Sequence, residues 1–313
     1  CLISCFLTPH GGVDYTWPPE LRREVEALVG RYRFDVEFRT EDRDRILAEV
    51  YEMSERRFRV AEHLLRTRPW DLFVLVEIGL DRVHHAFWKF LDPSHPRHQP
   101  GRYSRVIPEY YRWLDERLGR LLGLLGDDTA VLVVSDHGAK AMKGAFCLNE
   151  YLVRRGYLAL RDRPAPGTPL ERAPVDWSRT RAWAWGGYYA RVFLNVRGRE
   201  PQGVIPPEDY ERERRRLAEE LCDLRGPNGE PWNTRVLLPE EHYGICRGDP
   251  PDLMVYLDDL CWRSAGTLGH PGLYLPENDT GPDDAVHANC LLYTSDAADD
   301  GESVDLGGRR IIK

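Results

Sequence analysis

A chain of 313 residues can fold as one large α/β domain or as two smaller ones. Lys and Arg number 43 against 51 Asp and Glu, and the formal charge of -8 without a basic stripe argues against a nucleic-acid polymer as partner. The sequence lacks a run of about 20 apolar residues, so it predicts no membrane span. An anionic substrate must then be attracted by a local positive group, and a pair of bound metal ions would serve.

The seven cysteines are scattered along the chain and form no CxxC pair. This pattern is typical of free thiols in a reducing compartment, so we expect a cytoplasmic protein. Residues 1–7 are too short and too uncharged for a signal peptide. Because the sequence begins at Cys1 without a Met, we expect a fragment whose natural start lies upstream.

The first part of the chain predicts a short strand followed by helices. Residues 2–7 are apolar and predict a strand, and residues 9–19 form a loop rich in Gly and Pro. Apolar residues recur at helical spacing over 20–30 and again over 42–66, which predicts two amphipathic helices. We expect the apolar faces of both helices to lie in the core rather than to bind a cofactor.

Two apolar runs then flank a third helix. Residues 72–78 (LFVLVEI) and 129–134 (TAVLVV) are almost continuously apolar, as is typical of strands buried on both faces of a parallel sheet. Residues 108–125 between them predict a strong amphipathic helix. Strand, helix and strand in this order form a βαβ unit. The fold class predicted is α/β, a mostly parallel central sheet flanked by helices, with a smaller irregular inserted subdomain.

The inserted subdomain is expected at about residues 140–180. The sequence there is irregular and includes a Pro-rich stretch at 163–174. Strands are predicted within 182–196, where aromatic and small residues alternate, and at 252–257. A charged helix is predicted at 208–224 between them.

Acidic and imidazole side chains follow both predicted buried strands. Asp81 and His85 come after the first strand, and Asp136 and His137 directly after the second. Because the carboxyl ends of parallel strands meet at one edge of a sheet, we expect these four side chains to converge. Asp81 and His85 are four residues apart, so both would lie on one face of a helix if a helix begins near Asp81. A turn at Gly138 would bring Asp136 and His137 to one cation. Carboxylate oxygen and imidazole nitrogen suit zinc, manganese or iron.

Each pair also has a plainer structural interpretation. Asp81 would cap a helix and His85 would be an ordinary core or surface histidine. Asp136 and His137 would form a polar strand end exposed to solvent. His84, one residue from His85, is expected to point elsewhere. A metal site accounts better for two Asp and His pairs at the same sheet edge, so we favour it.

Three further residues are weaker candidates. His287, in the acidic segment 283–287, would complete a ligand set or be an ordinary loop histidine. Lys140 follows the Ser-Asp-His-Gly stretch closely and would contact phosphate or lie solvated on the surface. His270, in Gly-His-Pro-Gly, is a candidate for the mouth of a pocket.

A pair of glycines and several aromatic residues stand between the two later strands. Gly186 and Gly187 would let the backbone approach a ligand closely, and a tight turn explains them equally well. The neighbouring aromatic side chains are expected to pack rather than to stack on a substrate: Trp183, Trp185, Tyr188 and Tyr189.

Five stretches together resemble a known family. They are WDLFVLVEIGLDRVHHAFWKF, VLVVSDHGAK, RVFLNVRGREPQGVI, PDLMVYLDD and TGPDDAVHA, and they span about residues 5–288. The ensemble is similar to the type I phosphodiesterase/nucleotide pyrophosphatase branch of the alkaline phosphatase superfamily. Within it, the sequence most resembles the predicted phosphohydrolase/phosphomutase group. The SDHG stretch and the spaced Asp and His residues are the most specific signals.

The resemblance implies a division of the ligands between two metals. Asp81, His85 and His287 match the ligands of one metal, and Asp136 and His137 match two ligands of the other. The family completes the second site with an Asp near the N-terminus and attacks with a Thr or Ser. Neither is identified in this sequence, so both are expected upstream of Cys1 and no catalytic residue is assigned.

The resemblance also implies the domain limits. Residues 1–289 match a partial hydrolase domain of the alkaline phosphatase type. Residues 290–313 instead resemble translated sequencing-adaptor read-through, and we expect a non-native tail there.

The implied function is hydrolysis of a phosphate ester with two divalent cations, zinc or manganese. Two cations about 4 Å apart clamp a phosphate and stabilise the attacking and leaving oxygens. The expected partner is a small phosphorylated substrate, and the oligomeric state stays open. A sulfatase would need a Cys-x-Pro-x-Arg motif, which this sequence lacks. The alternatives are a phosphomutase of the same superfamily and a non-catalytic, metal-stabilised binding domain.

Overall fold

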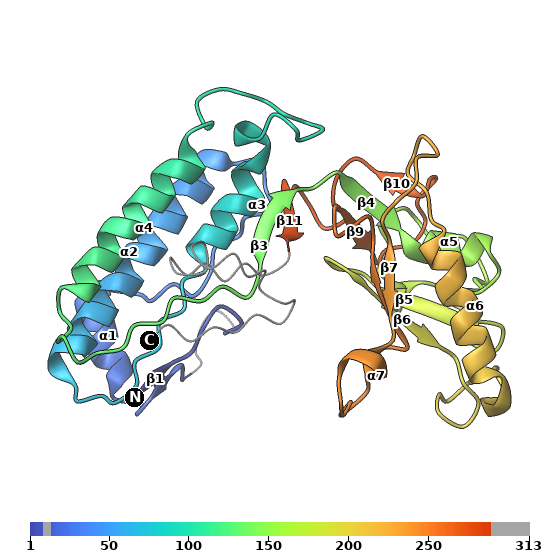
Figure 1. Ribbon diagram of the computed structural model, residues 1–313, viewed down its shortest axis with the longest axis horizontal. Helices are drawn as coiled ribbons and strands as arrows, with labels where there is room; N and C mark the ends of the chain where they lie inside the picture. The colour runs from blue at the N-terminus through green and yellow to red at the C-terminus, as the bar shows by residue number, and fades with distance from the viewer. Residues whose placement is uncertain (9–13, 289–313) are drawn as a thin grey trace, which may run out of the picture. The chain divides into compact units, whose positions relative to one another are not determined.

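The structure is a computed structural model that describes residues 1–8 and 14–288 (Figure 1). The described chain divides into an N-terminal unit, up to Ala139, and a C-terminal unit, Lys140–Ala288. The expected tail at 290–313 lies outside the described residues. Both helices and sheets are present, so the chain is a mixed α/β protein, as predicted. Within the described ranges, no helix is long and apolar enough to cross a membrane.

The N-terminal unit is mainly helical. Its elements are β1 (Leu2–Ile3), antiparallel to β2 (Thr16–Trp17), and the helices α1 (Leu21–Val29), α2 (Arg43–Thr67), α3 (Gly79–Leu91) and α4 (Val106–Leu122). The three predicted helices, at 20–30, 42–66 and 108–125, are confirmed within a few residues, and α3 begins near Asp81, which the expected shared face of Asp81 and His85 required. Helix α2 begins at Asp42, whose carboxylate accepts a hydrogen bond from the Arg45 backbone N–H at 3.2 Å.

The core of this unit is formed by the apolar faces of three helices. Helices α2, α3 and α4 pack against one another and bury the side chains of Ile46, Val50, Met53, Phe58, Val83, Phe87, Ile107 and Tyr110. Full burial of a large apolar side chain contributes about 1.5–3 kcal/mol each. Apolar spacing along α2 and α4 thus forms a core, as expected from the sequence.

The two segments predicted as buried parallel strands differ from expectation. Residues 72–78 and 129–134 are not paired in any sheet of the described chain. In the first segment Phe73 packs against the helical core, while the alternate residues Leu72 and Val74 are 80% and 73% exposed. The expectation of a sheet here came from apolar character alone, but a strand also needs a neighbouring backbone to bond its N–H and C=O groups. A mostly parallel central sheet is therefore not formed by these residues.

The C-terminal unit contains two sheets. In the first, of order β10–β4–β9, β4 (Gly144–Cys147) is parallel to β9 (Trp262–Ala265) and antiparallel to β10 (Tyr274–Leu275). The second is antiparallel throughout, in the order β5 (Ala182–Trp185), β6 (Ala190–Leu194), β8 (Leu253–Tyr256), β7 (Arg235–Leu237). The strands predicted within 182–196 and at 252–257 are thus confirmed. Strand β3 (Gly138–Ala141) spans the division between the units, and β11 (Ala285–Ala288) ends the described chain.

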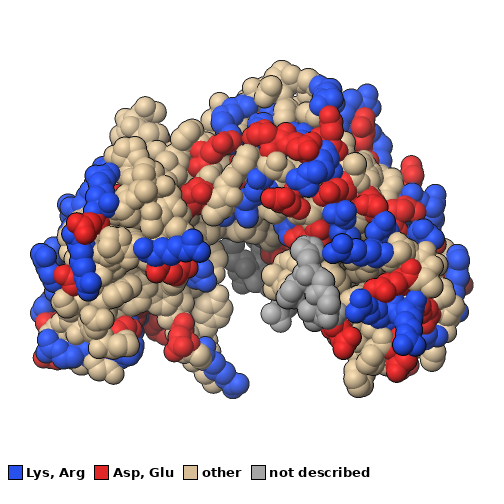
Figure 2. All heavy atoms as spheres, turned by 180° about the vertical axis from the view of Figure 1, so that it is seen from behind, with Lys and Arg blue, Asp and Glu red and all other residues tan. Residues whose placement is uncertain are grey.

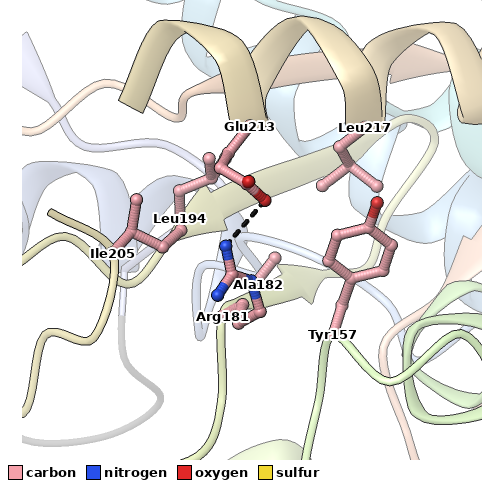
Figure 3. Close-up of a pocket in the computed structure, with 7 residues that line it drawn as sticks. All are labelled: Tyr157, Arg181, Ala182, Leu194, Ile205, Glu213 and Leu217. Atoms are coloured by element: carbon pink, nitrogen blue, oxygen red, sulfur yellow. Dashed lines mark ion pairs between the residues drawn. The ribbon is translucent and has the colours of Figure 1, made fainter. Parts of the chain in front are cut away.

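Helices cover these sheets. They are α5 (Leu148–Arg154) and α6 (Tyr210–Cys222). The unit also contains the short α7 (Pro239–His242) and two 3-10 turns, η1 (Leu170–Arg172) and η2 (Pro207–Asp209). Helix α6 packs on β7 and β8, and α5 packs on β5 and β9 (Figure 1). Figure 3 shows the junction of α6 with the sheet, where Glu213 forms an ion pair with Arg181 at 2.7 Å beside Leu217 and Tyr157. This ion pair therefore ties α6 to the residue that directly precedes β5.

Surface charge is mixed in sign. On the face shown in Figure 2, basic and acidic side chains are interspersed. Such mixing is typical of a soluble surface with many weak, exposed ion pairs. Attraction of an anionic substrate would then depend on a local group rather than on the overall field of this face.

The C-terminal core should depend on its central antiparallel strand. Leu253 in β8 is fully buried, so we expect Leu253→Ala to lower the free energy of unfolding by about 2–5 kcal/mol. Ile245→Ala is the control, because Ile245 is 75% exposed and its truncation should change stability by less than about 0.5 kcal/mol. Urea unfolding followed by tryptophan fluorescence measures both; equal effects would show that β8 is not the core strand.

Candidate metal centre

The start of α3 is held by a buried polar network centred on Glu77. One carboxylate oxygen of Glu77 accepts hydrogen bonds from the Ser54 hydroxyl at 2.6 Å and the Gly79 N–H at 2.7 Å. The other oxygen pairs with the Arg57 guanidinium at 3.2 Å. Burial raises the pKa of the Tyr110 hydroxyl, which therefore stays protonated and donates to Glu77 at 3.2 Å. The network fixes where α3 begins, two residues before Asp81.

At the start of α3, the neighbours of Gly79 leave no room for a side chain. A Cβ atom there would lie 2.1 Å from the Tyr110 hydroxyl oxygen and 2.6 Å from the Ser54 hydroxyl oxygen. Contacts that short do not occur, so any larger residue would displace the network. The first helical residue of α3 is therefore a glycine because the network packs directly against its backbone.

Asp81 and His85 lie on one face of α3, as the four-residue spacing predicts. The Asp81 Oδ1 atom is 3.3 Å from His85 Nε2. The His85 side chain is only 2% exposed, and its ring is tilted against Phe38 with a centroid distance of 5.4 Å. Burial and ring packing hold the imidazole in one orientation beside the carboxylate.

His137 approaches the same carboxylate from another part of the chain. Its Nε2 atom lies 4.0 Å from Asp81 Oδ1 and 3.7 Å from Asp136 Oδ1. Its Nδ1 atom lies 3.0 Å from the Gly138 carbonyl oxygen, a contact that requires a proton on Nδ1. With the proton on Nδ1, the nitrogen left to bind a metal is Nε2, the one that lies nearer the carboxylates of Asp81 and Asp136. The Asp136 side chain is 90% exposed.

The spacing of these donors fits a divalent cation. Zinc binds carboxylate oxygen and imidazole nitrogen at about 2.0–2.2 Å, so two ligands of one ion lie about 3–4 Å apart. The separations of Asp81 Oδ1 from His85 Nε2 and His137 Nε2, 3.3 and 4.0 Å, fall in that range. Oxygen and imidazole donors also suit manganese. The pair Asp81–His85 and the pair Asp81–His137 of the N-terminal unit therefore each have the atom types and spacing of two ligands of one cation.

Arg82 orients the central carboxylate. Its guanidinium donates to Asp81 Oδ2 at 2.6 Å and binds Asp35 through two parallel contacts of 2.7 and 2.6 Å. The guanidinium also lies over the Phe38 ring, 4.7 Å from its centroid. With Oδ2 held by Arg82, Oδ1 is the oxygen turned toward the two imidazoles. Sequence reasoning missed this clamp, because Asp35 lies 47 residues before Arg82 and carries no motif.

His84 points away from this cluster. Its ring packs edge-on against Trp88 at 5.3 Å and against Tyr111 at 5.7 Å. Burial, and after it the neighbouring His85, lower the pKa of His84 to about 4. The His84 imidazole is thus neutral near pH 7 and serves the packing of α3, in line with the expectation that it would not join the Asp81 face.

His287 belongs to β11 in the C-terminal unit. Its imidazole stacks on the Tyr188 ring with a centroid distance of 3.5 Å and an interplanar angle of 23°. Tyr188 therefore packs, as expected, and what it packs on is one of the predicted ligands. The assignment of His287 to a metal stays a prediction.

Lys140 and His270, the two weak substrate-binding candidates, both have partners in the C-terminal unit. The Lys140 ammonium donates to the backbone carbonyl of Asp259 and pairs with its carboxylate at 3.3 Å. His270 is 8% exposed, and its Nε2 lies 2.7 Å from the Thr267 hydroxyl. These contacts give both residues a structural role, and a role in substrate binding stays a prediction.

The stability that Arg82 contributes should depend on the planar shape of its guanidinium as well as on its charge. Arg82→Lys keeps the charge and loses the two-pronged contact with Asp35, so we expect a loss of about 1–3 kcal/mol in the free energy of unfolding. The control is Arg102→Lys, because Arg102 pairs with Asp44 at 2.7 Å on an exposed surface and should cost less than about 1 kcal/mol. Chemical denaturation compares them, and a clamp of no importance would give equal values.

Comparison with known proteins places the chain in a family. Among curated proteins no sequence matches it. The family model described as type I phosphodiesterase/nucleotide pyrophosphatase matches residues 3–283, which is most of the chain. Members of that family are phosphoester hydrolases that generally use divalent metals. The chain therefore belongs to the type I phosphodiesterase/nucleotide pyrophosphatase family of the alkaline phosphatase superfamily.

Proposed function

We propose that this protein hydrolyses a small phosphate ester with the help of two divalent cations. Asp81, His85 and His287 would hold one cation, and Asp136 and His137 would hold part of the coordination sphere of the other. The observation that supports this most directly is the Asp81 carboxylate, clamped by Arg82 on one oxygen and facing two imidazoles with the other.

The protein residues would supply rigid, correctly protonated donors. His85 is held by burial, and His137 presents Nε2 because Nδ1 donates to the Gly138 carbonyl oxygen. Bound divalent cations would offset the charge that develops on the attacking and leaving oxygens of a phosphate ester. A carboxylate held by a guanidinium at one oxygen reorganises little when the other oxygen binds a cation, and such preorganisation favours tight binding.

The finer points of the activity are part of this proposal. The nucleophile would be a Thr or Ser, and no residue of the printed sequence is assigned to that role. A phosphomutase would use the same ligands and return the phosphoryl group to a second hydroxyl, so an added alcohol acceptor separates the two activities. Donor chemistry allows zinc and manganese alike. We also propose a cytoplasmic protein, with residues 140–180 as an insertion.

The parallel sheet stays a proposal for the active protein. Its support is the almost continuously apolar run at 72–78, of which Leu72, Val74 and Val76 are exposed. Strands buried on both faces have this composition. Slow amide hydrogen exchange in both 72–78 and 129–134 would agree with strand pairing, and fast exchange in both would exclude it.

Metal binding tests the ligand assignment. We expect His85→Ala and His137→Ala each to weaken binding of Zn²⁺ or Mn²⁺ by about 10-fold or more, because each removes an imidazole donor from the Asp81 cluster. His63→Ala is the matched control: His63 lies in the same unit and pairs with Glu24 at 2.6 Å, away from this cluster. Isothermal titration calorimetry gives affinity and stoichiometry.

Two outcomes would reject the proposal. Metal affinity that responds no more to His85→Ala and His137→Ala than to His63→Ala would remove these histidines from the ligand set. Turnover is measured on the natural full-length protein with an aryl phosphomonoester and an aryl phosphodiester. A metal-loaded protein that hydrolyses neither ester would not be the hydrolase proposed.

A further inference from the structure

Gly186 and Gly187 dock the chain directly onto strand β9. The Gly187 N–H donates to the Ser264 carbonyl oxygen, and the Ser264 N–H donates back to Gly187, both at 2.9 Å. A Cβ atom on Gly186 would lie 2.4 Å from the Gly266 nitrogen and 2.6 Å from the Ser264 oxygen. The backbone that these glycines approach is thus β9, and the approach brings Tyr188 next to Arg263.

Arg263 is fixed behind the Tyr188 ring. Its Cζ atom lies over the ring, 4.1 Å from the centroid, a cation–π contact. Its guanidinium also pairs with Asp283 at 3.2 Å, with side chains 7% and 0% exposed. Both members of this pair are removed from water, so breaking it would leave a buried charge without its partner. The tyrosine ring therefore rests on a support that is costly to move.

His287 stacks on the other face of the same ring. Groups centred 3.5 and 4.1 Å from one ring centroid would overlap if they shared a face, so Tyr188 separates His287 from Arg263. Asp283 lies two residues before β11 and four residues before His287. Arg263, the Tyr188 ring and the His287 imidazole thus form a stack. The segment that ends in β11 contacts this stack at two points, because Asp283 pairs with Arg263 and His287 packs on Tyr188.

We propose that Tyr188 is a positioning residue for His287. Stacking fixes the plane of the imidazole, while the nitrogen lone pairs that bind a metal lie in that plane, so the two interactions are compatible. The Arg263–Asp283 pair holds the tyrosine ring, and the tyrosine ring holds the imidazole. This inference rests on the proposed function, in which His287 is a metal ligand, and adds the residue that orients it.

The test separates the aromatic face of Tyr188 from its volume. Tyr188→Phe keeps the ring, whereas Tyr188→Leu and Tyr188→Met keep apolar volume without it. We expect the two aliphatic variants to weaken Mn²⁺ binding at one of the two sites by about 10–100-fold, as loss of a ligand's orienting partner does, and Tyr188→Phe to restore it. Tyr189→Leu is the control, since Tyr189 contacts Tyr256 edge-on at 5.4 Å and not His287.

The stacking of His287 on Tyr188 can also be measured by NMR without metal. In the metal-free protein the ring protons of His287 should be shifted upfield by the Tyr188 ring current. NMR should show this shift in the wild type and in Tyr188→Phe and its loss in the aliphatic variants. Thermal unfolding of all variants identifies any that fail to fold. If one of the two aliphatic variants does not fold, the other still tests the loss of the ring.

The outcomes distinguish this inference from the proposed function. If His287→Ala weakens Mn²⁺ binding but Tyr188→Leu and Tyr188→Met do not, Tyr188 is not a positioning residue and the ligand assignment stands. Equal losses in Tyr188→Phe and the aliphatic variants would also overturn the inference. If His287→Ala leaves Mn²⁺ binding unchanged, the assignment of His287 in the proposed function fails, and the positioning of a ligand by Tyr188 fails with it.

Discussion

The largely buried carboxylate of Glu77 is the constraint on which the N-terminal unit depends. It accepts hydrogen bonds from α2 through Ser54, from the first residue of α3 through Gly79, and from α4 through Tyr110. A buried charge is tolerated only when it is paired and hydrogen-bonded, and Arg57 completes that requirement. Because all partners must be in place together, the network fixes three helices and the start of α3 at once.

The same logic extends from Glu77 to the candidate metal centre. The position at which α3 begins decides which residues face His137, and the first turn carries Asp81 and Arg82. The Arg82 guanidinium then donates to the carboxylates of Asp35 and Asp81, so that one oxygen of Asp81 is turned toward the imidazoles. A polar network of this kind leaves few alternative arrangements, because each partially satisfied alternative exposes a buried charge.

In the C-terminal unit a comparable role falls to backbone packing and a buried ion pair. The glycines before Tyr188 allow two backbones to meet at distances that no Cβ would permit, and the Arg263–Asp283 pair supports the ring that results. The segment leading into β11 is held at two points, because Asp283 pairs with Arg263 and His287 stacks on the Tyr188 ring. His287 therefore owes its orientation to residues distant in sequence.

By itself the sequence determined the helices, the later strands and the pairing of Asp81 with His85, because periodicity and a four-residue spacing are local properties. It also carried the family resemblance that the family model confirmed over residues 3–283. Only the tertiary structure decided that residues 72–78 and 129–134 stay unpaired, since a strand depends on a neighbour that its own composition does not specify. The Asp35–Arg82–Asp81 clamp likewise joins residues far apart in the chain, and so does the stack of His287 on Tyr188 and Arg263. Contacts of that kind are set by packing rather than by sequence pattern.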